Sequence, residues 1–170
     1  SDSKSATGNF AGTSVRLTQS TVQLDGRVFQ LLDLPGCYSL NAGDDAERIS
    51  RDHLLSQPVD LVINVVDSMQ LARSLELTYE LLELGLPMAI ALNMQDEAEK
   101  HGLLIDHEKM ERELGVPVVP TSALHGKGVR QLMERSLRLL DAPPLPRPAP
   151  RYDRTPPPVA PDVDPCRRRR

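Results

Sequence analysis

The chain has 170 residues, of which 39% are hydrophobic and 26% are charged, and this balance predicts a folded globular domain with a buried core. The net charge of −4 excludes a global basic field, and the 3% of aromatic residues argues against a base-stacking surface, so we expect no nucleic-acid partner. No apolar run approaches the roughly 20 residues of a membrane-spanning helix. The two cysteines, Cys37 and Cys166, show neither metal-ligand spacing nor a disulfide pattern, which favours a reducing compartment.

The first third of the chain predicts a hairpin followed by a helix. In chain order we expect a polar loop over residues 1–13, a strand from Val15 to Leu24, a turn at Asp25-Gly26, a strand over Val28–Leu32 and a helix over Ala46–Ser56. Either Asp44 or Asp45 could cap that helix.

Beyond residue 60, strands and helices alternate. The expected elements are strands over Leu61–Val66, Pro87–Leu92 and Val116–Val119, and helices over Leu71–Leu84, Asp106–Leu114 and Val129–Leu140. The strands are apolar throughout, and such strands lie in parallel sheets that helices cover on both faces. The sequence therefore predicts an α/β fold with a mostly parallel sheet, to which the opening hairpin adds an antiparallel edge.

The composition changes after the last expected helix. Residues 143–165 hold ten of the 15 prolines, and the chain finishes with four arginines. We therefore divide the chain into a folded domain of residues 1–140 and a Pro/Arg-rich tail of residues 141–170, which we expect to be extended or disordered. Two hypotheses for the tail stay open: a basic segment near an anionic membrane, or, as we favour, unrelated sequence that arose by truncation or a frame change.

Three short motifs follow three of the expected strands, at the sheet edge where open parallel sheets bind ligands. The first is Asp33-Leu34-Pro35-Gly36, of the form D-x-x-G. An acidic group at a strand end can hold a magnesium ion through water, and a glycine lets a backbone N–H approach a terminal phosphate. A plain turn explains this motif equally well when it is taken alone.

The second motif, Asn93-Met94-Gln95-Asp96, has the form N-x-x-D. A carboxylate at its last position can accept two hydrogen bonds from the N1–H and N2–H₂ edge of guanine, a donor pair that adenine lacks. The alternative for the motif alone is a helix cap at Asn93 or Asp96.

The third motif is Thr121-Ser122-Ala123, in which a small residue lets a backbone N–H reach the guanine carbonyl. Taken alone, it reads as an ordinary Ser/Thr turn. Order and spacing change this balance, because N-x-x-D begins 60 residues after D-x-x-G and T-S-A begins 28 residues later, each at the end of an expected strand. The arrangement is typical of a guanine-nucleotide-binding domain.

The flanking residues narrow this interpretation. Residues 8–12 (GNFAG), 33–40 (DLPGCYSL), 60–67 (DLVINVVD), 81–85 (LLELG) and 91–96 (ALNMQD) resemble the amino-terminal G domain of ferrous iron transport protein B, a bacterial membrane transporter for Fe(II). The resemblance covers about residues 4–140. It implies a P-loop-type GTPase fold at the cytoplasmic face of the bacterial inner membrane, GTP or GDP and Mg²⁺ as ligands, and a membrane transport domain on the same or a neighbouring polypeptide.

The resemblance also implies roles for single residues. Asp33 would hold Mg²⁺ through water, and the N–H of Gly36, which follows Leu34 and Pro35, would contact the γ-phosphate. The residues implied to surround guanine are Asn93, Met94, Gln95, Asp96, Thr121, Ser122 and Ala123.

In the first switch, the resemblance places Gly12, Thr13 and Ser14 at the nucleotide. Ser14 stands at the position of the family's Mg²⁺-binding threonine, although the neighbouring Thr13 leaves the assignment open.

The sequence also departs from the family. No G-x-x-x-x-G-K-[ST] motif occurs, so the first strand and the phosphate-binding loop of the family are missing. We expect two interior strands to lose a partner and the stretch alone to fold poorly or to bind GTP very weakly. Cys37 stands where many G proteins place a water-orienting Gln, which predicts slow hydrolysis, although a plain buried residue is the reading we favour. Met94 stands where many G domains have a Lys, which predicts looser affinity.

Three functions stay in view. The first is a GTP-binding regulatory domain of an Fe(II) transporter, in which nucleotide orders two switches, at about residues 5–15 and 34–50, and slow hydrolysis is coupled to uptake of Fe(II). The second is a non-catalytic remnant, and the third is a soluble translational-type GTPase, against which the DLPGCYSL segment argues. The histidines are scattered, and we expect them to be solvated or structural: His53, His101, His107 and His125.

Overall fold

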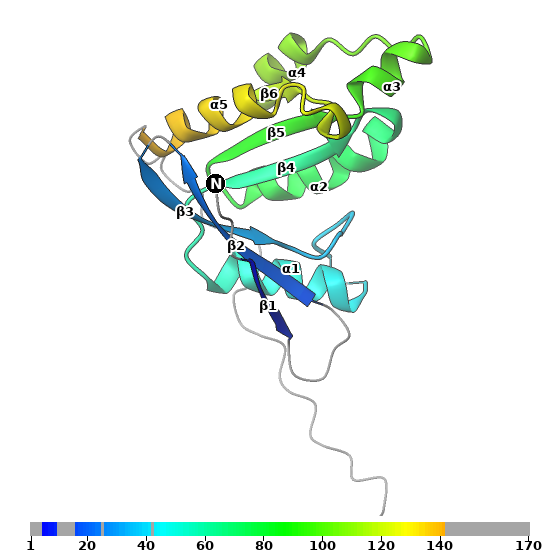
Figure 1. Cartoon of the computed structure of the whole chain (residues 1–170). Helices are drawn as coiled ribbons and strands as arrows, with labels where there is room; N and C mark the ends of the chain where they lie inside the picture. The colour runs from blue at the N-terminus through cyan, green and yellow to red at the C-terminus, as the bar shows by residue number, and fades with distance from the viewer. Residues whose placement is uncertain (1–4, 10–15, 25, 42, 142–170) are drawn as a thin grey trace, which may run out of the picture.

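The computed structural model of the chain describes residues 5–9, 16–24, 26–41 and 43–141 (Figure 1). Gly12, Thr13, Ser14 and the Pro/Arg-rich tail after Asp141 lie outside these residues. The described part holds two three-stranded sheets, one antiparallel and one parallel. None of its helices is long and apolar enough to cross a bilayer.

The antiparallel sheet has the order β1-β2-β3, formed by β1 (Ser5–Asn9), β2 (Arg16–Leu24) and β3 (Arg27–Asp33). The predicted hairpin is confirmed, and Gly26 in its turn has a φ of 75°, a left-handed conformation that glycine adopts without strain. The predicted loop over residues 1–13 is wrong at β1. The residues SATGN carry no apolar alternation, and it is antiparallel pairing with β2 that makes them a strand.

The parallel sheet has the order β4-β5-β6, formed by β4 (Val62–Asp67), β5 (Met88–Asn93) and β6 (Val118–Pro120). Alternate residues of β5 belong to two different core clusters, so each face of the sheet is covered. Helix α2 (Leu71–Glu83) packs against β4, while α5 (Val129–Asp141) packs against β5. The predicted α/β fold with helices on both faces is confirmed.

The remaining helical elements are α1 (Asp45–Ser56), η1 (Ser68–Gln70), α3 (Gln95–Lys100), α4 (His107–Leu114) and η2 (Ala123–His125). Asp44 caps α1 by accepting a hydrogen bond from the Glu47 N–H at 2.8 Å, as one of the two predicted caps would. The sequence reading missed α3, which has six residues and begins after a residue in a left-handed conformation, Met94.

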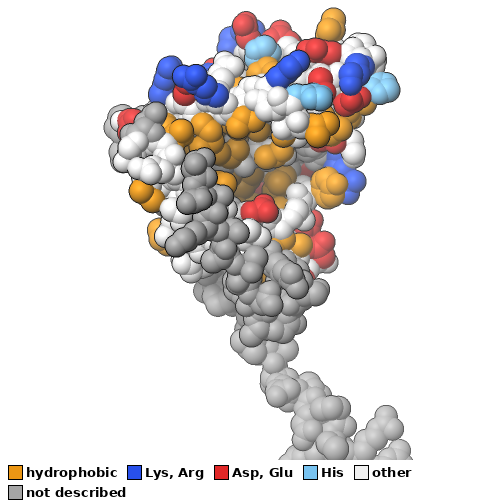
Figure 2. Space-filling model, viewed as in Figure 1, with side chains coloured by type: hydrophobic (Ala, Val, Ile, Leu, Met, Phe, Trp, Pro, Cys, Tyr) orange, Lys and Arg blue, Asp and Glu red, His pale blue; other side chains and the backbone are white. Residues whose placement is uncertain are grey.

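The hairpin does not join the parallel sheet as its edge, which corrects the expectation of a single mixed sheet. Strand β3 pairs only with β2, and β4 pairs only with β5, so each keeps one edge without a ladder in the described part of the chain. Val28 and Leu31 of β3 and Val65 of β4 are 66%, 47% and 64% exposed. In the same view, Figure 2 shows hydrophobic side chains gathered in a band across a hollowed face.

Helices α4 and α5 are held together by one ion pair. The Arg135 guanidinium donates to both carboxylate oxygens of Glu111, at 2.9 and 2.5 Å, and the Val118 N–H donates to the same carboxylate at 3.1 Å. The hydrogen bond from Arg135 is the main cause that holds the pKa of Glu111 below its ordinary value of 4.5. The pair therefore links two helices to β6 through one charged group.

We expect Glu111→Gln to lower the free energy of unfolding by about 1 kcal/mol near neutral pH, because both side chains are about one-third exposed and solvent screens their attraction. Since the pKa of Glu111 is lower in the folded than in the unfolded chain, its contribution is complete above pH 4.5 and is lost as the pH falls below that value. Urea unfolding at about pH 7 and about pH 3.5 measures this. Glu113→Gln, an exposed neighbour on α4, is the control, and a difference between Glu111→Gln and wild type that does not shrink at the lower pH would contradict the assignment.

Candidate functional site

The carboxyl end of the parallel sheet brings two of the three motifs together. Asp67 at the end of β4 lies in register with Asn93 at the end of β5, and Leu92 lies in register with Pro120 of β6. The N-x-x-D and T-S-A motifs therefore leave the sheet side by side, at the edge where open parallel sheets bind ligands.

Asn93 ties the two motifs to each other. Its Oδ1 accepts a hydrogen bond from the Ala123 N–H at 3.0 Å and lies 3.4 Å from the Thr121 hydroxyl. The backbone adds two further bonds, from the Thr121 N–H to the Leu92 carbonyl at 2.8 Å and from the Gln95 N–H to the Thr121 carbonyl at 3.2 Å. The two loops are thus fixed relative to each other.

The alternative reading of N-x-x-D as a helix cap is wrong. The N-cap position of α3 is Met94, which makes no side-chain capping bond, and Asn93 is bonded to the other loop. Met94 has φ and ψ of 60° and 30°, a left-handed conformation uncommon for a residue other than glycine. This turn directs α3 away from the strand and places Asp96 in the first turn of the helix.

Asp96 lies beside the T-S-A loop, with a side chain that is 21% exposed. The Ser122 hydroxyl is the main cause that holds the pKa of Asp96 below its ordinary value, and the charges of His125 and Lys100 add to the effect. His125 Nε2 lies 3.4 Å from Asp96 Oδ2. Ser122 Oγ is buried and has no hydrogen bond of normal length with any described residue, so this hydroxyl acts on Asp96 as a nearby dipole.

His125, which was expected to be solvated or structural, is half-exposed and contacts Asp96, in agreement with that expectation. The pairing crosses from η2 to α3, and sequence spacing gives no signal for such a contact.

The loop after β6 closes tightly on itself. Ser122 and Lys127 exchange two backbone hydrogen bonds, each of 3.1 Å, and η2 lies between them. Gly128 ends the loop with a φ of 75°, and a Cβ at this position would lie 2.1 Å from the Pro120 carbonyl oxygen. Only glycine fits this approach, and the sequence analysis did not single it out.

The D-x-x-G motif follows β3 in the other sheet. Asp33 is the exposed last residue of that strand, and its carboxylate makes no hydrogen bond or ion pair with the described residues. Leu34 and Cys37 pack against the main core cluster, and the Ser50 hydroxyl donates to the Pro35 carbonyl at 3.2 Å. Gly36 is exposed, with open space where a Cβ would stand. Within the described part, no hydrogen bond or ion pair joins this motif to the other two.

Cys37 is half-buried against the core, as the plainer of its two readings predicted. Burial is the main cause that raises the pKa of its thiol, so the neutral form prevails near neutral pH. A neutral thiol in this position is a packing group.

Asp33 could bind a hydrated cation, whereas the described residues form no cluster of side chains that could enclose a metal ion. In the described residues, no three His, Cys, Asp or Glu side chains cluster closely enough to hold a metal ion. A lone, exposed carboxylate can hold a hydrated magnesium ion if phosphate oxygens supply other ligands. Asp33 has the chemistry for this, because its oxygens are engaged with no described partner.

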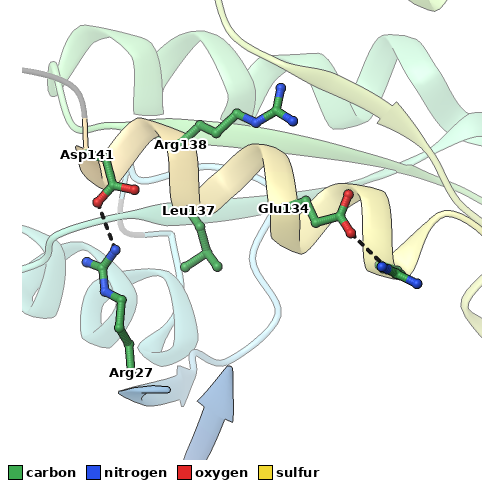
Figure 3. A pocket seen from close by; sticks show the side chains of 6 residues that line it. Arg27, Glu134, Leu137, Arg138 and Asp141 are labelled. Carbon is green, nitrogen blue, oxygen red and sulfur yellow. Dashed lines mark hydrogen bonds and ion pairs between the residues drawn. The ribbon is translucent and has the colours of Figure 1, made fainter. Parts of the chain in front are cut away.

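A pocket of about 500 Å³ lies away from these motifs, between the hairpin turn and α5 (Figure 3). It is lined by Arg27, Arg130, Glu134, Leu137, Arg138 and Asp141. Arg27 pairs with Asp141 at 2.8 Å and Arg130 pairs with Glu134 at 2.8 Å, and these four side chains are largely exposed. Such surface pairs contribute little to stability, and the pocket shares no residue with the motifs.

The family profile described as "Ferrous iron transport protein B" matches residues 1–136 of the chain. The chain is 45% identical over 117 residues to the Fe(2+) transporter FeoB of Helicobacter pylori strain J99, an alignment that covers 68% of the chain and 18% of that transporter. It is 40% identical over 134 residues to the Fe(2+) transporter FeoB of Escherichia coli K12, which covers 76% of the chain and 17% of that transporter. The chain thus spans less than a fifth of the length of these curated relatives.

Solved structures show the same likeness. The cytosolic domain of the T. maritima FeoB iron transporter in its apo form matches with a TM-score of 0.78 and 36% identity, over 83% of the chain and 56% of that domain. The same domain in a GMPPNP form matches with a TM-score of 0.77 and 37% identity, over 82% of the chain and 55% of that domain. The FeoB G-domain from Methanococcus jannaschii matches with a TM-score of 0.71 and 39% identity, over 73% of the chain and 80% of that domain.

The close approach of Gly128 makes a specific prediction. We expect Gly128→Ala to lower the free energy of unfolding by about 2–4 kcal/mol, because the added Cβ must displace the Pro120 carbonyl or the loop. Gly102→Ala is the matched control, since Gly102 has a φ of 73° but no atom within 4 Å of the added Cβ, and it should cost about 1 kcal/mol. Equal losses in urea unfolding of the two variants would show that the contact with Pro120 is unimportant.

Proposed function

The chain belongs to the ferrous iron transport protein B family, and we propose that it is the guanine-nucleotide-binding regulatory domain of an Fe(II) transporter. The observation that carries this proposal is the hydrogen-bonded pair of loops at the end of the parallel sheet, in which Asn93 holds the T-S-A loop beside Asp96. Nucleotide would bind at this edge.

The guanine end of the proposed site rests on Asp96. Its carboxylate is partly exposed, and its lowered pKa keeps it ionised near neutral pH, so it can accept from N1–H and N2–H₂ of guanine. His125, whose Nε2 lies 3.4 Å from Asp96 Oδ2, would be the side chain next to guanine at this carboxylate. Met94, which is 40% exposed at the same turn, would lie against the base, and Gln95 would lie next to Met94. The loop of Thr121, Ser122 and Ala123 would close over the base.

The phosphate end of the proposed site rests on Asp33 and Gly36. Mg²⁺, when bound, would neutralise phosphate charge. Asp33 would hold the ion through water, while Ser14 or Thr13, next to Gly12, would supply a hydroxyl ligand. Gly36, which is exposed, would turn its N–H to the terminal phosphate.

The free edges of β3 and β4 support a further part of this proposal. A strand from residues that precede the chain would pair with both edges and would cover Val28, Leu31 and Val65. It would lead into the phosphate-binding loop that the sequence lacks. Without this strand, we expect the described residues to bind nucleotide weakly. Weak binding is the one property that would favour the alternative of a non-catalytic remnant.

Hydrolysis is expected to be slow and to act as a switch. Cys37 stands where a water-orienting side chain would be needed, and its half-buried neutral thiol cannot orient water as a glutamine does. The two switches, at about residues 5–15 and 34–50, would respond to the γ-phosphate, and a membrane transport domain at the cytoplasmic face of the bacterial inner membrane would read the change and admit Fe(II). Family membership argues against a translational-type GTPase.

Guanine recognition is tested with Asp96→Asn in the full-length protein. The amide would turn a donor toward the donor edge of guanine, so we expect the affinity for a fluorescent GDP analogue to fall about 100-fold or more. Glu99→Gln on the same helix is the control, because Glu99 is exposed and its side chain makes no hydrogen bond or ion pair in the described part of the chain. Competition with GTP and ATP completes the test: displacement by both nucleotides alike, or equal binding by the two variants, would rule out this guanine site.

The magnesium assignment is tested with Asp33→Asn. Loss of one carboxylate charge should weaken Mg²⁺-dependent binding of a GTP analogue about tenfold and should leave binding of GDP without Mg²⁺ nearly unchanged. Asp60→Asn removes the same charge from an exposed residue that has no partner among the described residues, and it should change neither affinity. Equal losses with and without Mg²⁺ would show that Asp33 does not act through the ion.

A further inference from the structure

The segment Tyr38–Asn41, which follows the D-x-x-G motif, is fastened to helix α2 by one carboxylate. Glu80 accepts hydrogen bonds from the Ser39 hydroxyl at 2.8 Å, from the Asn41 side-chain amide at 2.7 Å and from the Leu40 N–H. The Ser39 hydroxyl also accepts from the Asn41 N–H at 3.0 Å. Three consecutive residues are thus bound to one carboxylate. The bonds to Glu80 are charge-assisted, and the bond from the Asn41 N–H to the Ser39 hydroxyl reinforces one of them.

A second contact comes from the same face of α2. The Arg73 guanidinium carbon lies 3.6 Å from the centre of the Tyr38 ring, close enough for a cation–π interaction. Arg73 and Glu80 are seven residues apart, about two helical turns, so both face the segment. The helix therefore holds the segment at both of its ends.

The residues around Gly36 are anchored in turn. Before it, Leu34 packs against the core and the Pro35 carbonyl accepts from the Ser50 hydroxyl. After it, Leu40 is 1% exposed in the same core cluster, at the point where Glu80 takes its N–H. Gly36 is thus a short exposed bridge between two fixed points.

We propose that Glu80 is a positioning residue for nucleotide binding: by holding Ser39, Leu40 and Asn41, it keeps the Gly36 N–H placed for a terminal phosphate. This inference rests on the proposed function. A donor that is already placed loses less conformational freedom when it meets its acceptor, so binding is tighter. Because Gly36 would meet only the terminal phosphate of GTP, Glu80 should favour GTP over GDP and should leave guanine recognition unaffected.

The test is Glu80→Gln in the full-length protein. The amide keeps the size of the side chain but replaces one acceptor oxygen with a donor. That donor must face either the Leu40 N–H or the pair formed by the Ser39 hydroxyl and the Asn41 amide, because the carboxylate holds them with different oxygens. We expect the affinity for a non-hydrolysable GTP analogue to fall about tenfold relative to the affinity for GDP, and amide hydrogen exchange at Tyr38–Asn41 to become faster in the ligand-free protein. A merely structural role would weaken both nucleotides alike.

Glu76→Gln is the matched control, because Glu76 lies one turn earlier on α2, is exposed and has a side chain that makes no hydrogen bond or ion pair in the described part of the chain. It should change neither the affinity ratio nor the exchange. Glu80→Asp keeps the negative charge on a side chain that is shorter by one methylene. We expect its preference for the GTP analogue over GDP to lie between those of Glu80→Gln and the wild type. An unchanged or increased ratio in Glu80→Gln would overturn the inference while the wild-type protein still binds GTP and GDP. A wild-type protein that binds neither nucleotide would overturn the proposed function as well.

Discussion

Strand β5 is hydrogen-bonded along both edges and buried on both faces, and the geometry of the proposed base site depends on it. Five of its six residues, Met88 to Leu92, are buried, and its register with β4 and β6 fixes where Asn93 emerges. The Thr121 N–H then bonds to the Leu92 carbonyl, which carries the ladder one step beyond β6. Beyond the last backbone bond of this ladder, the Asn93 side chain accepts the hydrogen bond that joins the two loops. Two loops that are far apart in sequence are therefore positioned by one continuous row of hydrogen bonds.

The phosphate end is held in a different way. Among the described residues, the second edge of the strand that Asp33 ends carries no ladder. The residues after Asp33 are fixed by side chains: Leu34 and Leu40 in the core, and Glu80 on the segment that follows. Side-chain anchors can be released one at a time, whereas a ladder of backbone bonds opens cooperatively. This difference suits a proposed site in which the base is held steadily and the segment near the phosphate is the part that responds.

The sequence predicts most of the regular elements because their patterns are local. The apolar runs and amphipathic helices after residue 60 are long enough for periodicity to show, and the neighbouring position of N-x-x-D and T-S-A follows from adjacent parallel strands. What the sequence misses depends on tertiary partners. β1 becomes a strand by pairing with β2, and α3 follows a left-handed turn at Met94. The contacts of His125 and Glu80 cross between elements far apart along the chain.

The edges of β3 and β4 that carry no ladder in the described part of the chain also bear on the solution behaviour of this stretch. A free edge beside exposed Val28, Leu31 and Val65 offers backbone donors and acceptors next to apolar side chains, and this combination templates pairing between molecules. No proline or lysine interrupts either strand to discourage such pairing. In isolation, this stretch of chain would tend to self-associate through intermolecular sheets. Aggregation would begin at the same strand edges that we propose an additional strand to cover.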